Sequence, residues 1–518
     1  MSNAPAILRS LIVYAVCVPL AIIVGYLLTN PMDYSTLGLF GIVVLLLVSP
    51  LLLRWHHPLL ILSWNMGVTL FFLKGSPSLW LVMVALSLGI SLLERALSSQ
   101  MHFIRAPQIT WPLLCLVGVV LLTARLTGGF GVRAFGSDVY GGKKYIFLLV
   151  GILSYFALTS RRIPPERAGL YVALFFLGAV TSFIGDLFSL FPAWAHFVFW
   201  LFPASANSFF AFDVGETRLG GFAATGIAIW SFLMARYGIR GIFLSGKLWR
   251  LVIFTLALSL IFLGGFRSEL VYVGLVFMFL FFLEGLHRTR LLLVFAGVGI
   301  MAAVAIIPSA SKLPFTFQRT LAILPLQLDP AVRLETQQSV DWRVNMWKAL
   351  LPQVPQHLLL GKGLAITPEE YNEMMGTSLG MATGQFDPGQ DPYALAYDYH
   401  NGPLSVIIPF GLWGAIAILW FLGAGLRALY CNFRYGDPAL QTINLFLFVN
   451  FLVTIVIFVA VFGAITSDIA KFAGSLGLSI ALNGGVCRPV PQPVPAKETF
   501  FRPQGVLPGS RPRPAFPR

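Results

Sequence analysis

The sequence has few charged residues for its length. Asp, Glu, Lys and Arg make up 11% of the 518 residues, whereas a soluble globular protein carries about 25%. A surface that faces water needs those charges, so their scarcity excludes a fold in which most of the surface is hydrated. Hydrophobic residues make up 57% of the chain. We therefore expect that much of its surface faces lipid.

Cysteine is also scarce, and nucleotide-binding motifs are missing. Cys17 and Cys115 lie in apolar runs, while Cys431 and Cys487 fall in segments that we expect to face the cytoplasm. No pair meets an oxidising compartment, so we expect no disulfide. The sequence contains neither a Gly-x-x-x-x-Gly-Lys-Ser/Thr motif nor a dinucleotide fingerprint. We expect no cofactor and no ATP-driven step.

Long apolar runs recur from the N-terminus to about residue 483. About 20 apolar residues in a helix cross the hydrocarbon core of a bilayer, and continuous rather than alternating runs favour helices over a barrel. The sequence predicts an all-α polytopic membrane protein with about fourteen spans, in a range of 12 to 14. The predicted spans are 10–29, 36–53, 58–73, 79–93, 110–124, 144–159, 168–188, 220–236, 249–263, 268–285, 290–307, 403–424, 442–463 and 468–483.

Basic residues orient these spans. The formal net charge is +14, which in a soluble protein would suggest nucleic acid. Here alternate loops carry the Arg and Lys residues, so the positive-inside rule explains them and we expect no nucleic-acid partner. Both termini then face the cytoplasm, and the long segment 308–402 faces the opposite side as a loop with an amphipathic helix from Val340 to Leu351. The predicted site of the protein is the bacterial inner membrane.

The predicted topology divides the chain into four parts. Residues 1–307 form an N-terminal transmembrane bundle of about eleven helices, and 308–402 form a large periplasmic loop subdomain. Residues 403–484 form C-terminal transmembrane helices. The tail 485–518 is rich in Pro and Arg, cannot bury a core, and is predicted to be disordered in the cytoplasm.

Three arginines on the predicted outer side run against the positive-inside trend. Arg218, Arg267 and Arg343 either pair with the nearby carboxylates Glu216, Glu269 and Asp341 or bind an anionic ligand. Guanidinium groups match phosphate oxygens bidentately and keep their charge when partly buried. A lipid diphosphate at the outer leaflet would fit all three.

His400 follows Asp398 at the point where the long loop enters a membrane helix. A lone His at a helix start is more often a capping or packing residue, but its pKa range suits removal of a proton from a sugar hydroxyl. Asp398 would orient the ring. Asp387, Asp391 and Asp398 are spaced like a loose calcium loop, but the run lacks the dense oxygen ligands of such a site, and we expect no metal.

The residues around His400 resemble the O-antigen ligase family. His400 and Asn401, nine residues, then Gly411 and Gly414 match the family's His-Asn/Ser/Gln-x9-Gly-x-x-Gly pattern. Other elements are similar over residues 215–425: an Arg before a span, an Arg-x-x-x-Trp element, a Gly-x-Gly element, and an Arg-Leu-x-Gly-Phe element shared with the related polymerases. In this sequence they are Arg267, Arg343 with Trp347, Gly361 with Gly363, and the segment 218–222.

The resemblance implies a membrane-embedded glycosyltransferase. Such enzymes take a glycan from undecaprenyl diphosphate on the periplasmic side and pass it to an acceptor hydroxyl, without metal and with inversion at the anomeric carbon. For ligases the acceptor belongs to the lipid A core of lipopolysaccharide. His400 would be the base, and Arg267, Arg343 and Arg218 would bind the diphosphate. The family usually has about twelve helices, fewer than predicted here.

Several alternatives stay open from the sequence. An O-antigen or exopolysaccharide polymerase would use another lipid-linked glycan as acceptor, and a protein O-oligosaccharyltransferase would use a protein. A transporter or flippase is a rival from a different class and would place charged residues deep inside several helices. The sequence offers few of them: Asp186, Asp468 and Lys471.

Overall fold

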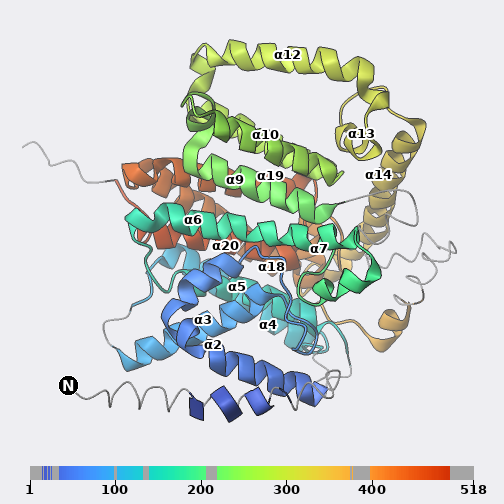
Figure 1. The fold of residues 1–518 in the computed structure, drawn as a ribbon. Coiled ribbons are helices and arrows are strands. Elements are labelled where there is room, and N and C mark those ends of the chain that lie inside the picture. The colour runs from blue at the N-terminus through green and yellow to red at the C-terminus, as the bar shows by residue number, and fades with distance from the viewer. Residues whose placement is uncertain are drawn as a thin grey trace, which may run out of the picture.

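The structure of the protein is a computed structural model. It describes residues 34–98, 102–131, 139–205, 219–373 and 397–489, together with Gly376 and nine positions between 14 and 25. Across these residues the chain is helical and contains no β-strand. Figure 1 shows that most of the helices lie side by side as a bundle. The all-α prediction is confirmed.

The bundle is made mainly of long helices, each of 16 residues or more. In chain order they are α2 (Tyr34–Ser63), α3 (Leu79–Leu97), α4 (Pro107–Leu126), α5 (Gly142–Leu158), α9 (Gly220–Phe243), α10 (Leu248–Leu263), α11 (Arg267–Leu283), α12 (Leu291–Ser309), α18 (Gly402–Tyr435), α19 (Gln441–Ala460) and α20 (Ile465–Asn483). The expected span 168–188 is divided into α6 (Ala168–Leu177), the 3-10 turn Gly178–Thr181 and α7 (Ser182–Ser189).

Nine helical segments within the described residues are long and apolar enough to cross a membrane. Their outer faces carry large exposed apolar side chains, among them Leu122, Trp413 and Leu419. Water would penalise such a surface, whereas lipid does not. The chain is therefore a multi-pass membrane protein, as predicted. α5, α10 and α11 are 16 or 17 residues long and fall below the length needed for this count.

One expected division between spans is wrong. The predicted spans 36–53 and 58–73 are joined in the single helix α2, and residues 64–78 do not form a helix of their own. Polar and small residues turn the chain there. The Asn65 amide donates to the Phe175 carbonyl, and the backbone at Gly67 lies so close to Ser182 that a Cβ would be 2.6 Å from its hydroxyl.

The centre of the bundle is formed by α20, which packs against α5, α18 and α19. Its sequence ITSDIAKFAGSLGLSIALN is rich in Gly, Ala and Ser, and small residues let membrane helices approach closely. By contrast, α12 buries no residue and stands apart at the top of Figure 1. The protein thus has a tightly packed interior and one helix whose surface is almost wholly available to lipid.

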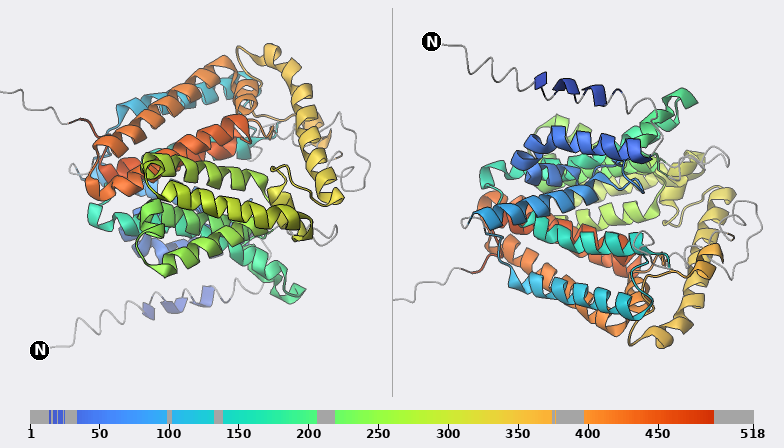
Figure 2. Two further views of the ribbon diagram at one scale, coloured as in Figure 1. Left: turned by 90° about the horizontal axis from the view of Figure 1, so that it is seen from above. Right: turned by 90° about the horizontal axis from the view of Figure 1, so that it is seen from below.

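The long segment after α12 contains further helices: α13 (Phe315–Leu321), α14 (Pro330–Leu350) and α15 (Val354–His357). Asp329 caps α14 by accepting a hydrogen bond from the Ala331 amide, and Pro330 suits the first helical position. Both further views show α14 crossing one end of the bundle (Figure 2). This position places α14 over the start of α18, where the candidate site lies.

Candidate active site

His400 lies in a tight turn directly before α18. Its backbone φ is 49° and that of Tyr397 is 56°, a left-handed conformation that non-glycine residues seldom adopt. Asn401 caps α18, with its side-chain oxygen accepting a hydrogen bond from the Leu404 amide at 3.0 Å. The turn and the cap together fix the imidazole at the point where the loop meets the bundle.

Asp398 determines which nitrogen of His400 carries the proton. Nδ1 of His400 is 3.0 Å from Oδ1 of Asp398 and 3.2 Å from the Asp398 carbonyl oxygen. Both oxygens are acceptors, so Nδ1 must be the donor, and the neutral ring keeps its lone pair on Nε2. This is the arrangement that a base needs when a carboxylate orients it.

The charge of Asp398 is also favoured by its neighbours. Burial opposes the ionised form, but the hydrogen bond from His400 and the charges of His400 and Lys144 outweigh it and hold the pKa of this carboxyl below its usual value. The side chain of His400 is 14% exposed and that of Asp398 is 42% exposed. The pair is therefore sheltered on the imidazole side and open to solvent on the carboxylate side.

Two aromatic rings from distant parts of the chain hold the imidazole edge-on. The Trp342 ring of α14 lies 5.3 Å from it at 89°, and the Phe462 ring lies 4.6 Å from it at 79°. Such perpendicular contacts are the favoured geometry for aromatic pairs. Trp342 directly precedes Arg343 in the chain. The helix α14 therefore packs against His400 and also carries the arginine that is predicted to bind an anion.

Trp347 fixes the position of α14. Its indole Nε1 donates to the Tyr399 carbonyl at 2.8 Å, while Met346 and Leu350 are buried beneath the helix. Arg343 lies one turn before Trp347, and Ser339 one turn before Arg343, so all three share one face. The Arg-x-x-x-Trp element therefore has a structural reason: the Trp docks the helix that presents the Arg.

Arg267 and Arg343 come together at this face. Arg267 opens α11, and its Nη2 donates to the Ser339 hydroxyl at 3.3 Å. Burial, and then the positive charge of Arg267, lower the pKa of Arg343. Nε of Arg343 is buried without a hydrogen-bond partner. Burial and a like charge nearby both disfavour the charged form of Arg343, and an anion bound to it would compensate for both.

The pairing of Arg343 with Asp341 does not occur. Within the part of the chain that the structure describes, Arg343 forms neither a hydrogen bond nor an ion pair. A half-buried guanidinium without an anion is unfavourable, because burial removes the water that would otherwise solvate it. Of the two alternatives for Arg343, the ion pair with Asp341 is therefore absent from the described residues, and the binding of an anionic ligand stays a prediction.

The motif glycines form one joint. Gly411 has φ 63° and ψ −160° and breaks α18, which frees carbonyls that the helix would otherwise use. The amides of Lys362 and Gly363 donate to the Ile408 and Pro409 carbonyls at 2.8 and 2.9 Å. A Cβ at Gly361 would lie 2.2 Å from the Pro409 oxygen. Gly414 follows one turn after Phe410, whose Cβ occupies the space of a side chain there.

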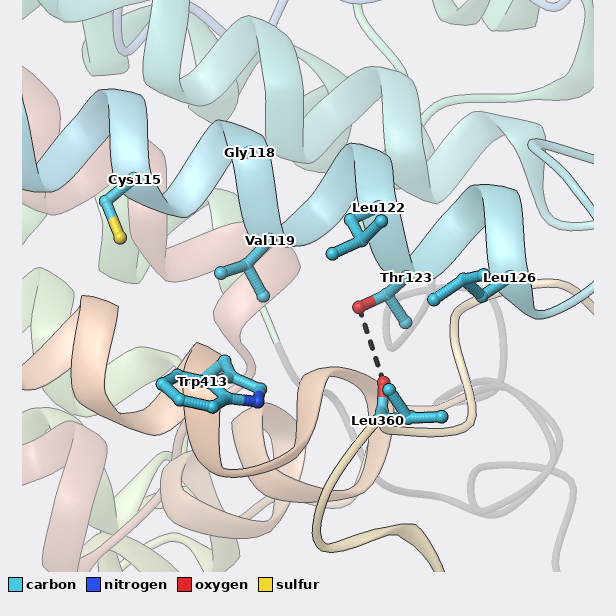
Figure 3. A pocket seen from close by; sticks show the side chains of 8 residues that line it. All are labelled: Cys115, Gly118, Val119, Leu122, Thr123, Leu126, Leu360 and Trp413. Atoms are coloured by element: carbon cyan, nitrogen blue, oxygen red, sulfur yellow. Dashed lines mark hydrogen bonds between the residues drawn. The ribbon is translucent and has the colours of Figure 1, made fainter.

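A cavity of about 300 Å³ lies beside this joint, between α4 and the second part of α18 (Figure 3). Its lining is almost entirely apolar: Cys115, Gly118, Val119, Leu122, Thr123, Leu126, Leu360 and Trp413. The Thr123 hydroxyl donates to the Leu360 carbonyl at 3.4 Å. No charged group lines the cavity, so the candidate chemistry belongs to His400 and not to this opening.

The sequence did not predict every residue at the site. Trp342, Phe462 and Lys144 were missed as neighbours of His400 and Asp398. For Lys144 a signal exists, since Lys143-Lys144 lies on the predicted outer side against the positive-inside trend, as the three arginines do. Lys471 was noted only as a charge inside a span, and its ammonium lies 2.8 Å from Asp468.

Some predicted site residues fall outside the described part of the chain. They are Arg218 and the acidic residues Asp387 and Asp391. Among the described residues, no group of three His, Cys, Asp or Glu side chains is placed to hold a metal ion. The prediction that the protein uses no metal is not tested by this observation.

A comparison with protein families gives an independent result. Residues 251–419 match a family described as O-antigen ligase. The matched segment contains Arg267, Arg343, His400 and the motif glycines, and excludes Arg218. No curated protein sequence matches the chain. The match to residues 251–419 confirms the resemblance to the O-antigen ligase family that was found in the sequence.

Proposed function

We propose that this protein transfers a glycan from undecaprenyl diphosphate to an acceptor hydroxyl on the periplasmic side of the bacterial inner membrane. The observation that carries the proposal is Arg343, a half-buried guanidinium beside Arg267 without an anionic partner among the described residues. Trp342, its neighbour in α14, packs on His400. An anion site and a base therefore adjoin at one end of the bundle.

The proposed reaction is a single displacement. Nε2 of His400 takes the proton of the acceptor hydroxyl, and the hydroxyl oxygen attacks the anomeric carbon of the donor sugar. The bond between that carbon and the diphosphate oxygen breaks, and the diphosphate leaves with the bonding electrons. Arg267 and Arg343 stabilise the charge that develops on it. One displacement inverts the anomeric centre, and the energy comes from the sugar–phosphate bond.

The cations make a metal ion unnecessary in this scheme. Charge on a leaving diphosphate is stabilised in proteins by a metal or by fixed cations, and here two guanidinium groups take that role. We propose that activity persists in the presence of a chelator. Loss of transfer in chelator, restored by calcium, would instead assign Asp387, Asp391 and Asp398 to a metal site.

The proposed topology follows the positive-inside rule. It has 12 to 14 spans, both termini in the cytoplasm, and the segment 308–402 in the periplasm. This orientation would place α14 and His400 at the outer leaflet, where a lipid diphosphate presents its head group. The four parts of the chain expected from the sequence belong to the same proposal.

A purified-protein assay tests the function. Wild-type protein should transfer glycan from the lipid diphosphate to an acceptor, and His400→Ala should abolish transfer while the protein remains folded in the membrane. His357→Ala is a matched control, because His357 lies in the same outer segment but outside the site. Wild-type turnover in His400→Ala would remove His400 from the mechanism.

The acceptor is proposed to be the lipid A core, as in an O-antigen ligase. The second candidates are a polymerase, with another lipid-linked glycan as acceptor, and a protein O-oligosaccharyltransferase. Glycan analysis of a deletion strain separates the first two. Unligated polymer accumulates when a ligase is lost, whereas single repeat units accumulate when a polymerase is lost.

A transporter is less well supported by the charges inside the helices. Asp186 is buried and accepts hydrogen bonds from the Ser205 and Gly221 amides at 2.8 and 2.5 Å. Asp468 accepts from the Ala464 amide and pairs with Lys471. Both carboxylates accept hydrogen bonds from backbone amides, as buried structural residues do. Movement of glycan across the membrane without bond transfer would overturn the enzyme proposal.

A further inference from the structure

An uncharged aromatic segment follows α7, and the proposed reaction does not use it. Residues 187–205 contain no Asp, Glu, Lys or Arg. Within them, Ala193–Trp200 forms a 3-10 helix of eight residues. Such helices seldom run beyond about four residues, because their hydrogen-bond geometry is poorer than that of an α-helix. The length and the winding of this segment therefore need a reason.

The 3-10 winding places three aromatic side chains on one edge. Residues three apart eclipse one another at three residues per turn, whereas in an α-helix each such step would turn by about 60°. Trp194, Phe197 and Trp200 therefore form a straight row, the aromatic ridge. Their side chains are 74%, 64% and 51% exposed, while Ala195 on another edge is fully buried. The helix thus turns its small residue inward and its largest rings outward.

Hydrogen bonds fix the orientation of the ridge relative to the bundle. The Thr69 amide donates to the Leu201 carbonyl at 2.9 Å, and the Thr69 hydroxyl donates to the Trp200 carbonyl at 3.2 Å. Further along, the Ser205 amide donates to Oδ1 of the buried Asp186 at 2.8 Å. The segment is therefore attached to the bundle at its end, and the exposure of the ridge is part of the fold.

The ridge lies where the chain leaves a membrane-crossing segment. The helical run from Pro165 to Ser189 is long and apolar enough to cross a membrane, and the 3-10 helix begins directly after it. Leu190, between the two, is 52% exposed, so the ridge continues the lipid-facing surface of the bundle. Neither Trp194 nor Trp200 donates its indole N–H to a residue that the structure describes. Each has an apolar ring and a polar N–H without a partner.

We propose that the aromatic ridge binds phospholipid at the head-group boundary of the leaflet where α7 ends. The rings insert among the upper acyl chains, and the indole N–H groups donate to lipid oxygens. The hydrocarbon core would leave those N–H groups unpaired, and water would penalise the rings. Figure 1 shows α7 ending at the end of the bundle where α14 lies. The ridge therefore holds that end at a fixed depth.

Fluorescence quenching in vesicles tests this inference on the full-length protein. In a protein whose native cysteines are replaced, Trp194→Cys and Phe197→Cys carry an NBD label on the ridge. Ile300→Cys, exposed in the middle of α12, and Lys348→Cys, exposed on α14, are the references. The vesicles are phosphatidylcholine with phosphatidylglycerol, and they carry a nitroxide either at the head group or deep in the acyl chain. Iodide is the quencher in the water.

The depth of the label distinguishes the possible surroundings of the ridge. The head-group nitroxide should quench the labels at 194 and 197 at least about twofold more than the deep nitroxide. The label at 300 should show the reverse order, and iodide should be the main quencher at 348. Quenching of the ridge labels by iodide alone would place the ridge in water. Protection from all three quenchers would mean that protein covers it, such as a second copy of this chain. Either result would overturn the proposal.

Removal of the rings provides a second test, with the label at the small exposed Ala193. Trp194→Ser with Phe197→Ser should raise iodide quenching at 193 at least about twofold, because the segment leaves the boundary. The exchange Trp194→Phe with Phe197→Trp keeps the ridge and should behave like wild type. Leu92→Ser with Leu93→Ser is the matched control, since it removes two exposed apolar side chains from α3. Unchanged quenching in the first variant, or an equal change in the control, would refute the inference.

Discussion

At the scale of single residues, the proposed chemistry depends on the His400–Asp398 contact. The carboxylate accepts from Nδ1 and favours the protonated imidazole through its charge. An amide in its place offers a weaker acceptor and no charge. Asp398→Asn should therefore lower kcat at least about tenfold, and it should move the acidic limb of the kcat/KM profile to lower pH.

The pH profile distinguishes this role from a purely structural one. The acidic limb reports the protonation that disables the base, and removal of a nearby negative charge makes that protonation harder. A pH series of kcat/KM for wild type and Asp398→Asn provides the measurement. An acidic limb that stays in place, or moves to higher pH, would contradict the assignment of His400 as base and Asp398 as its partner.

Arg343 is the residue whose surroundings argue most directly for an anion. Arg343→Ala should lower kcat/KM for the donor by about a hundredfold, the loss typical of one preorganised transition-state contact. Arg343→Lys should fall between Ala and wild type, since an ammonium keeps charge but loses the bidentate fork. Lys348→Ala is the control, because Lys348 is exposed on the same helix.

The sequence predicted the residues that carry the motif but not those that surround them. His400, Asp398, Arg267 and Arg343 were identified from residue type and local pattern. Trp342 and Phe462 are separated from His400 by about sixty residues on either side, and aromatic residues are common in membrane helices. No local spacing could show that these two rings, and not others, enclose the imidazole.

At the scale of elements, the break in α18 is the feature that joins the loop to the bundle. The left-handed Gly411 frees the carbonyls that hold the Gly361–Gly363 segment. Gly411→Ala should destabilise the protein by about 1–3 kcal/mol, because alanine is strained at this φ and its Cβ would lie 2.8 Å from the Leu358 oxygen. Activity should fall as well.

Gly423 provides the control within the same helix. A Cβ there meets nothing within 4 Å, and alanine favours a helix by about 1 kcal/mol over glycine. Gly423→Ala should therefore leave the unfolding temperature unchanged or raise it, while Gly411→Ala lowers it. Equal effects of the two substitutions in a thermal unfolding measurement would mean that the break in α18 does not matter.

Helix positions were predictable where apolar runs end at polar or glycine-rich segments, as for α3, α10 and α19. The errors occur where a run continues past a change in structure. Residues 58–73 are apolar enough for a span, yet the chain leaves the helix after Ser63 to contact α6 and the 3-10 turn between α6 and α7. Hydropathy measures the free energy of transferring side chains from water to lipid, so it does not predict contacts between segments of the protein.

The length of α14 was also underestimated, for a related reason. Its first half, from Pro330, is polar and gives no hydropathy signal; only the piece from Val340 to Leu351 looked amphipathic. The capping Asp329 and the following Pro330 marked its true start. A reading based on caps would have found the helix that carries Arg343.

At the scale of the whole molecule, the candidate groups gather at one end. Lys144, Arg267, Arg343 and His400 come from α5, α11, α14 and the start of α18, and α14 crosses that end of the bundle. The loops at the opposite ends of these helices carry basic residues such as Arg161, which pairs with Glu94. By the positive-inside rule, this distribution of charge supports the proposed placement of the site on the outer side.

A cysteine-labelling experiment tests this sidedness. In a protein whose four native cysteines are replaced, single cysteines at Lys348 and Arg288 report opposite ends, since Lys348 is exposed on α14 and Arg288 is exposed between α11 and α12. An impermeant maleimide added to spheroplasts should label the cysteine at 348 alone. The cysteine at 288 should react only after the membrane is opened.

The opposite labelling pattern would place His400 and Arg343 in the cytoplasm. There the donor would have to be recognised before it crosses the membrane, and a periplasmic acceptor could not reach the base. In that case the transfer assay in detergent would still succeed, because solubilised protein exposes both ends of the bundle to the substrates. Labelling and transfer thus test independent parts of the proposal: the first tests where the arginine pair faces, and the second tests what it binds.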